Sequence, residues 1–210
     1  MWESTYHDVE MFDYTGREIK LQNIPAKRSS VGNVVLVNLD DVIKAEQKFL
    51  AEENDLPVLA IHPLLLLYAE SRFFSGGYIK HKFRFNKMVF LVWKELENIG
   101  YGRAFYFDDI GNGRAGPIPV HLKETLQTLA RLGLLEAKFA TRPGVSSEFK
   151  LTEKGRELAQ KLWRLTPIDV KTVIVKVKEN LYAVDTTQLK HIIHKKYPEY
   201  RKIYVENDAE

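Results

Sequence analysis

A run of leucines that ends at a glycine constrains the fold more than any other feature of the 210 residues. Four leucines follow one another at intervals of four, three and three positions, so they share one face of a helix. They are Leu122, Leu126, Leu129 and Leu132. Gly133 suits the position just past a last helical turn, where a left-handed backbone is needed. The pattern predicts a helix over Pro119–Leu132.

Two short apolar segments follow this helix and indicate a β-hairpin. Leu134–Phe139 and Glu148–Leu151 have the character of strands, and Arg142-Pro143-Gly144 between them is typical of a turn. Thr152 then suits the N-cap of a further helix that runs to about Arg164. This order is that of a winged helix-turn-helix. We expect a mainly α, α+β fold with such a core, its hairpin wing over Leu134–Leu151, and an N-terminal α/β extension.

The same segment predicts a surface for DNA, because a helix fits the major groove and a wing can reach phosphates. The residues expected to contact DNA are polar or cationic and lie on the helix or the wing. They are His121, Lys123, Gln127, Arg131, Lys138, Arg142 and Lys150. Ser146 and Ser147 are further candidate phosphate donors. Glu124 on the same helix face opposes this interpretation. The wing cations can equally belong to a solvated hairpin, and winged helices also serve as protein-interaction modules.

The whole chain is expected to divide into three parts. They are an acidic N-terminal region (1–75), the winged-helix domain (76–165) and a helical extension (166–210). In the first region the sequence predicts a loop over Lys27–Gly32, a strand over Val34–Val37 and a helix that starts at an Asp40 cap and ends near Asn54. The apolar segment Leu56–Arg72 is expected to be helical after Pro63 and buried on most sides.

Further elements are expected on either side of the winged helix. A helix with apolar residues from Met88 to Ile99 closes at Gly100, and a strand follows over Phe105–Phe107. Gly111–Gly113 is expected to form a turn, and Gly116–Pro119 to start the next helix. Beyond the core, Val170–Val177 begins a strand or a helix. A last helix covers Thr186–Lys196 behind an Asp185 cap, and its basic side chains face solvent, DNA or a second subunit.

Charge is unevenly distributed along the chain. Residues 1–70 hold 6 Lys and Arg against 12 Asp and Glu, whereas residues 71–210 hold 25 against 16. A basic region of this kind favours a polyanionic partner. Cysteine is absent, which excludes disulfides, cysteine-ligated zinc and a cysteine nucleophile. The sequence has no apolar segment of membrane-spanning length and no signal-peptide pattern at its start, so we expect a soluble cytoplasmic protein.

Three other constellations are weighed and set aside. Asp108 and Asp109 could act with His81 or His121 as acid and base, but paired carboxylates on a turn more often are solvated or cap a helix. His191 and His194 lie three apart on a helix without an evident third ligand, so we expect no metal site. Gly111–Gly116 lacks the ending of a phosphate-binding loop. We therefore expect neither an enzyme nor a cofactor.

Five short motifs in the second half of the chain resemble the Panacea family of small antitoxin- and adaptor-like prokaryotic proteins. They are Lys87–Leu91, Gly116–Pro119 with Leu122, Leu132–Leu135, Leu151–Gly155 and Lys195–Tyr200. The resemblance covers about residues 80–202 and extends to archaeal winged-helix proteins. Ala115 stands where the family usually has tyrosine. The resemblance implies regulation by binding DNA or a protein partner, without catalysis.

The sequence thus predicts a winged-helix transcription regulator that binds double-stranded DNA as a homodimer. The alternative is a protein-interaction module of antitoxin or adaptor type, whose acidic residues 1–70 and apolar segment 56–69 contact the partner.

Overall fold

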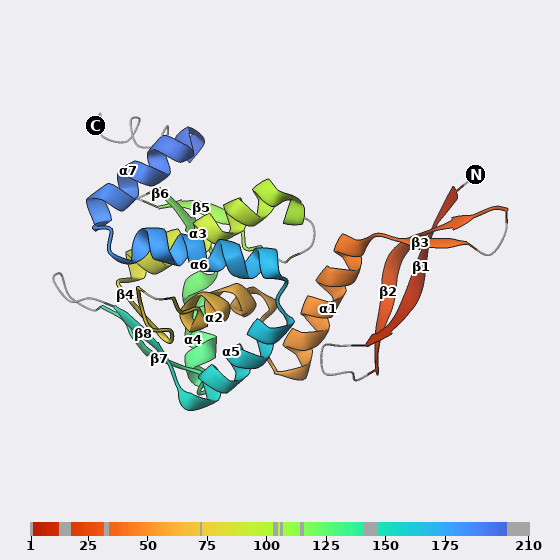
Figure 1. The fold of residues 1–210 in the computed structure, drawn as a ribbon, viewed down its shortest axis with the longest axis horizontal. Coiled ribbons are helices and arrows are strands. Elements are labelled where there is room, and N and C mark those ends of the chain that lie inside the picture. The colour runs from red at the N-terminus through yellow and green to blue at the C-terminus, as the bar shows by residue number, and fades with distance from the viewer. Residues whose placement is uncertain are drawn as a thin grey trace. The chain divides into compact units, whose positions relative to one another are not determined.

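The protein has an α+β fold of helices and small antiparallel sheets, seen in a computed structural model (Figure 1). The structure describes residues 2–12, 18–31, 34–71, 73–102, 105, 107–113, 116–140 and 147–200. Two compact units divide the chain. Unit 1 comprises Met1–Val58 and Leu96–Phe107, and unit 2 comprises Leu59–Glu95 and Asp108–Glu210. Unit 2 extends across positions 75 and 165, where the sequence-based segments meet.

Unit 1 contains a three-stranded antiparallel sheet of order β1-β2-β3, formed by β1 (Trp2–Phe12), β2 (Glu18–Ser29) and β3 (Val35–Val37). The strand expected over Val34–Val37 is confirmed, but the loop expected over Lys27–Gly32 is wrong, because β2 continues to Ser29. Buried residues alternate along β2, with one interruption, which gives the sheet one apolar face. They are Ile19, Leu21, Ile24 and Ala26.

Helix α1 (Leu39–Glu53) covers the apolar face of this sheet with Val42, Ala45 and Phe49. The predicted helix and its end near Asn54 are confirmed. The predicted Asp40 cap is wrong: Asn38 is the N-cap, and its side chain accepts a hydrogen bond from the Asp40 amide at 2.8 Å. A π-helical turn, η2 (Glu97–Tyr101), also belongs to this unit. Ile99, expected on an apolar helix face, is 49% exposed on that turn.

The centre of unit 2 is the apolar helix α2 (Ile61–Tyr68), preceded by the 3-10 turn η1 (Val58–Ala60). Every residue from Ile61 to Leu67 is buried, which confirms the burial predicted for this segment. The helix starts at Ile61, not after Pro63, and it ends at Tyr68, before the predicted Arg72. Helices α5 (Glu153–Leu165) and α6 (Ile168–Tyr182) pack against it. Residues 61–67 are therefore not exposed to a partner, although the alternative function assigned the partner surface to residues 56–69.

A second antiparallel sheet, of order β4-β8-β7, borders α2 and α5. Its strands are β4 (Tyr78–Lys80), β7 (Leu135–Lys138) and β8 (Glu148–Leu151). The two strands predicted for the wing are confirmed, and the turn with Arg142 lies outside the described residues. Helix α3 (Lys82–Leu96) follows β4 and buries Phe85, Met88 and Phe90.

The connection from α3 to α4 (Leu122–Arg131) differs most from the sequence-based prediction. Strands β5 (Ile110–Gly113) and β6 (Gly116–Pro119) pair as an antiparallel hairpin. The turn predicted at Gly111–Gly113 and the helix start predicted at Gly116–Pro119 are therefore wrong, and α4 begins three residues after Pro119. The strand predicted over Phe105–Phe107 is also wrong, since neither Phe105 nor Phe107 lies in a strand and residue 106 is outside the described residues.

Several of the remaining helix boundaries of unit 2 agree with prediction. Gly133 stops α4 with a φ of 70°, and the Thr152 hydroxyl caps α5 by accepting from the Gly155 amide at 3.0 Å. Val170–Val177 belongs to helix α6, not to a strand. Asp185 caps α7 (Thr186–Lys196), and the short 3-10 helix η3 (Pro198–Tyr200) follows. Within the described part of the chain, no helix combines the length and apolar character needed to cross a membrane.

Candidate nucleic-acid interface

The β5–β6 hairpin brings together two residues that are thirteen positions apart, Asp108 and His121. Ile110 pairs with Pro119 at the base of the hairpin, and the Val120 amide donates to the Asp109 carbonyl oxygen at 2.9 Å. Asp108 immediately precedes this base and His121 immediately follows it. Hairpin closure therefore places an aspartate beside the first turn of α4.

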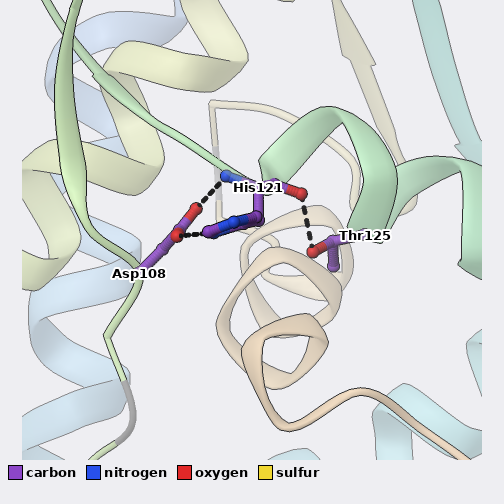
Figure 2. A network of polar contacts seen from close by, with 3 residues as sticks. All are labelled: Asp108, His121 and Thr125. Atoms are coloured by element: carbon purple, nitrogen blue, oxygen red, sulfur yellow. Dashed lines mark hydrogen bonds and ion pairs between the residues drawn. The ribbon is translucent and has the colours of Figure 1, made fainter.

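The carboxylate of Asp108 binds His121 through both of its oxygens (Figure 2). Oδ2 accepts a hydrogen bond from the His121 backbone amide at 2.5 Å, and Oδ1 lies 2.6 Å from the ring nitrogen Nδ1. The His121 carbonyl oxygen accepts from the amide and the hydroxyl of Thr125, at 2.9 and 3.0 Å. His121 is thus fixed at its backbone nitrogen, its backbone oxygen and one ring nitrogen.

The two residues of this pair differ in how deeply they are buried. The Asp108 side chain is 2% exposed, whereas that of His121 is 54% exposed. Because Nδ1 is occupied by Asp108, Nε2 is the ring nitrogen through which His121 can bind another molecule. The hydrogen bond to Asp108 and then the charge of that carboxylate raise the pKa of His121 above its ordinary value, and Glu124 and Asp109 act in the same direction. The charged imidazolium therefore persists to higher pH than in a free histidine.

Helix α4 buries one face and exposes the other. Leu122, Thr125, Leu126 and Leu129 are buried, in agreement with the leucine pattern, while Leu132 is half-buried beyond the end of the helix. The predicted contact residues Lys123, Gln127 and Arg131 are exposed, as is Glu124. Arg131 donates from Nη2 to the Thr128 hydroxyl at 2.9 Å, which orients its guanidinium along the helix.

Lys138 and Lys150, predicted for the wing, share the exposed face of the β4-β8-β7 sheet. Each lies directly opposite a carboxylate-bearing residue: Lys138 pairs in register with Glu148, and Lys150 with Glu136. This face therefore has mixed charge, to which Lys80 of β4 adds one further cation. Strands β7 and β8 therefore do not form a purely cationic face.

Other predicted contacts are placed differently or lie outside the described residues. Arg142 and Ser146 are among residues 141–146, which the structure does not describe. Ser147 is buried, and its hydroxyl oxygen accepts from the Ala140 amide at 3.0 Å, so it is not available to a phosphate. On α7, Lys196 forms an ion pair with Glu95. Among the described residues, no group of His, Asp or Glu side chains is suited to hold a metal ion.

The sequence assigned no functional role to Lys87 and predicted that Asp108 is solvated or caps a helix. Lys87 of α3 is fully buried and donates from Nζ to the Pro117 carbonyl oxygen at 2.6 Å, which ties β6 to α3. Burial lowers the pKa of Lys87 to about 8, and the charge of Lys190 adds to this effect. The sequence analysis considered Asp108 and His121 as a possible pair, but it did not predict the β5–β6 hairpin that brings them together.

No protein-family model matches the chain, and a search of curated proteins finds no match. The resemblance to the Panacea family therefore stays a prediction.

Proposed function

We propose that unit 2 is a winged helix-turn-helix module that binds double-stranded DNA and acts in transcription regulation. Helix α4 would enter the major groove, and the exposed face of β7 and β8 would lie along the phosphate backbone. A homodimer would place two α4 helices one turn of DNA apart, about 34 Å.

The order of elements in unit 2 supports the fold part of this proposal. Helix α2, strand β4, helices α3 and α4, and the strands β7 and β8 follow one another, and the sheet order is β4-β8-β7. Three helices against a three-stranded sheet of this order are typical of a winged helix. The β5–β6 hairpin is an insertion between the second and third helices in this scheme.

The single observation that carries the DNA part is the division of α4 into an apolar buried face and a polar exposed face. Lys123, Gln127 and Arg131 on the exposed face are of the types that contact base edges and phosphates. Helix α4 contacts β7, so the exposed lysines of the sheet lie on a neighbouring element. The basic balance of residues 71–210 favours the same partner.

Fluorescence anisotropy tests this proposal, with the whole chain titrated into a labelled random-sequence duplex at several salt concentrations. We expect the logarithm of the binding constant to fall linearly with the logarithm of salt concentration. Lys123→Gln and Lys150→Gln should each weaken binding and reduce that slope by about one unit. Lys161→Gln, which removes an exposed charge from α5, is the matched control. Flat, weak binding at low salt would exclude DNA as the partner.

One observation favours the alternative, a protein-interaction module. Trp2 and Tyr6 of β1 lie on the same face of the sheet as Leu36 of β3. All three side chains are exposed, Trp2 by 49%, Tyr6 by 70% and Leu36 by 53%. Exposed aromatic residues are enriched at protein interfaces. A double variant, Trp2→Ser with Tyr6→Ser, should release a partner that co-purifies in stoichiometric amount with the native chain. Co-purification unchanged by this variant would exclude the sheet face as the partner surface.

A further inference from the structure

We propose that His121 is a phosphate contact controlled by its protonation. Asp108 binds the ring at Nδ1, and the opposite nitrogen, Nε2, donates a hydrogen bond to a phosphate oxygen of duplex DNA only when the ring carries both protons. DNA binding would then take up a proton. This inference rests on the proposed function, and it adds a positioning residue, Asp108, and a dependence on pH.

The contacts of Asp108 determine which nitrogen of the His121 ring can contact a phosphate. Asp108 holds both the His121 amide and Nδ1, so the carboxylate fixes the backbone and the ring as one piece. A neutral ring in this position keeps its single proton on Nδ1, because a carboxylate oxygen only accepts. Nε2 is then an acceptor, which repels a phosphate oxygen. A second proton turns Nε2 into a donor, and the contact becomes a charge-assisted hydrogen bond.

The position of His121 also suits a backbone contact. It is the residue before the first turn of α4 and lies two positions before Lys123, an exposed cation of the face proposed to meet DNA. More than half of its side chain is exposed, while Asp108 is buried beneath it. The buried Asp108 carboxylate therefore holds the charged His121 ring in place, and the ring remains accessible to a ligand.

Three carboxylates act on the ring from the elements around it. Asp108 and Asp109 precede β5, and Glu124 lies in the first turn of α4. All three favour the imidazolium, and they raise the pKa of His121 in the free protein. A bound phosphate would favour the imidazolium further. Proton uptake is therefore expected between the pKa of the free protein and the higher pKa of the complex.

The sign of the effect follows from this linkage. Below the pKa of the free protein, His121 is charged before and after binding, so affinity does not change with pH. Above it, binding must add a proton, and affinity falls as pH rises, by at most about tenfold per pH unit for one proton. Above both pKa values the contact is absent in either state, and affinity is again constant.

The test is an anisotropy titration of the whole chain with duplex DNA from pH 5.5 to 8.5 at fixed ionic strength. For the native protein we expect binding to weaken by about fivefold across the transition, the scale of one exposed ion pair. His121→Gln, which is neutral at every pH, should remove this loss and bind as the native protein does at high pH. Asp108→Asn should move the transition to lower pH. The imidazole proton resonances of His121 report its pKa directly in each protein.

Lys123→Gln is the matched control, since it removes a neighbouring cation of constant charge. It should weaken binding equally at every pH and leave the shape of the profile unchanged. If His121→Gln keeps the native pH profile while DNA binding remains salt-dependent, this inference is wrong and the proposed function stands. If the native protein binds no duplex at pH 5.5 and low salt, both are wrong. His121→Gln leaves the bond from Asp108 to the backbone intact, so the test does not depend on Asp108→Asn folding.

Discussion

Lys87 donates a hydrogen bond to the carbonyl oxygen of Pro117 over 2.6 Å, and both residues are buried. The bond joins the middle of α3 to β6, the strand that leads into α4. The start of the helix proposed to meet DNA is therefore held from two sides, by Lys87 through the hairpin and by Asp108 through His121.

Lys87→Met is expected to lower the free energy of unfolding by about 1–3 kcal/mol, because it leaves the buried Pro117 carbonyl without its donor. Methionine keeps the length and the apolar stem of the side chain. Urea denaturation measures the change. Lys80→Met, at an exposed lysine of β4, is the control and should stay within about 0.5 kcal/mol. Equal stability of the two variants would contradict a role for the bond.

Stability should rise with pH above neutrality because of Lys178. This lysine of α6 is fully buried and donates from Nζ to the carbonyl oxygens of Leu67 and Ala69 at 3.0 and 2.6 Å. Burial lowers its pKa to about 7 from an ordinary 10.5. Between these two values the unfolded chain binds more protons than the folded protein, so the free energy of unfolding increases with pH, by at most about 1.4 kcal/mol per unit.

Urea midpoints at pH 6.5, 7.5, 8.5 and 9.5 test this, with Lys178→Met as the comparison. The native protein should gain stability over the variant as pH rises. Lys87, whose pKa is lowered to about 8, acts in the same direction but is present in both proteins and cancels in the difference. Parallel pH profiles would mean that Lys178 stays charged throughout.

Gly155→Ala should destabilise unit 2 by about 3 kcal/mol, the upper end for overpacking. A Cβ at Gly155, in the first turn of α5, would collide with the backbone carbonyl of Leu134. That carbonyl already accepts from the Thr152 amide at 3.2 Å, so it cannot easily move. Thermal unfolding checks the change, against Gln160→Ala at an exposed position of the same helix. A loss no larger than that of the control would show that α5 can shift away from β7.

Glu136→Gln should strengthen DNA binding severalfold at low salt. Glu136 is exposed on β7 directly opposite Lys150, and its charge opposes a phosphate on the proposed backbone-contacting face. An exposed charge contact is worth about 1 kcal/mol or less, so the gain should disappear as salt is raised. Glu157→Gln on α5 makes the same change in net charge elsewhere. If both variants bind equally well, net charge alone accounts for the effect.

Local signals in the sequence predicted the boundaries of α5 and α7 and the end of α4. Side chains that cap a helix act within three residues, so Thr152 and Asp185 identify their helices without knowledge of the rest of the fold. The leucine spacing of α4 and the stop at Gly133 are equally local. Strands β7 and β8 were predicted because a turn-forming sequence separates them.

The hairpin before α4 was missed because its sequence resembles a helix start. Proline is favoured in the first turn of a helix, and Pro117 and Pro119 lie in the segment Gly116–Pro119 that was expected to start one. Both are instead strand residues of β6. The pairing of Asp108 with His121 depends on this hairpin, so it could be considered from the sequence but not placed.

The long strands β1 and β2 were not predicted from the sequence for a different reason. The alternation of Ile19, Leu21, Ile24 and Ala26 was present in the sequence, but Asn23 interrupts its period with a φ of 56°. The buried lysines had no local signal at all. Lys178 is buried because α6 crosses the end of α2, which only the packing of the two helices determines.

The closed base of the β5–β6 hairpin has an evolutionary consequence. Ile110 pairs with Pro119, and the Val120 amide donates to the Asp109 carbonyl oxygen. The two ends of the hairpin are therefore held next to each other where they join the rest of unit 2. Lengthening or trimming the hairpin beyond that point, by matched residues on each strand, would not shift the first turn of the helix that follows. The hairpin could therefore differ in length between related sequences while α4 keeps its position on the rest of unit 2.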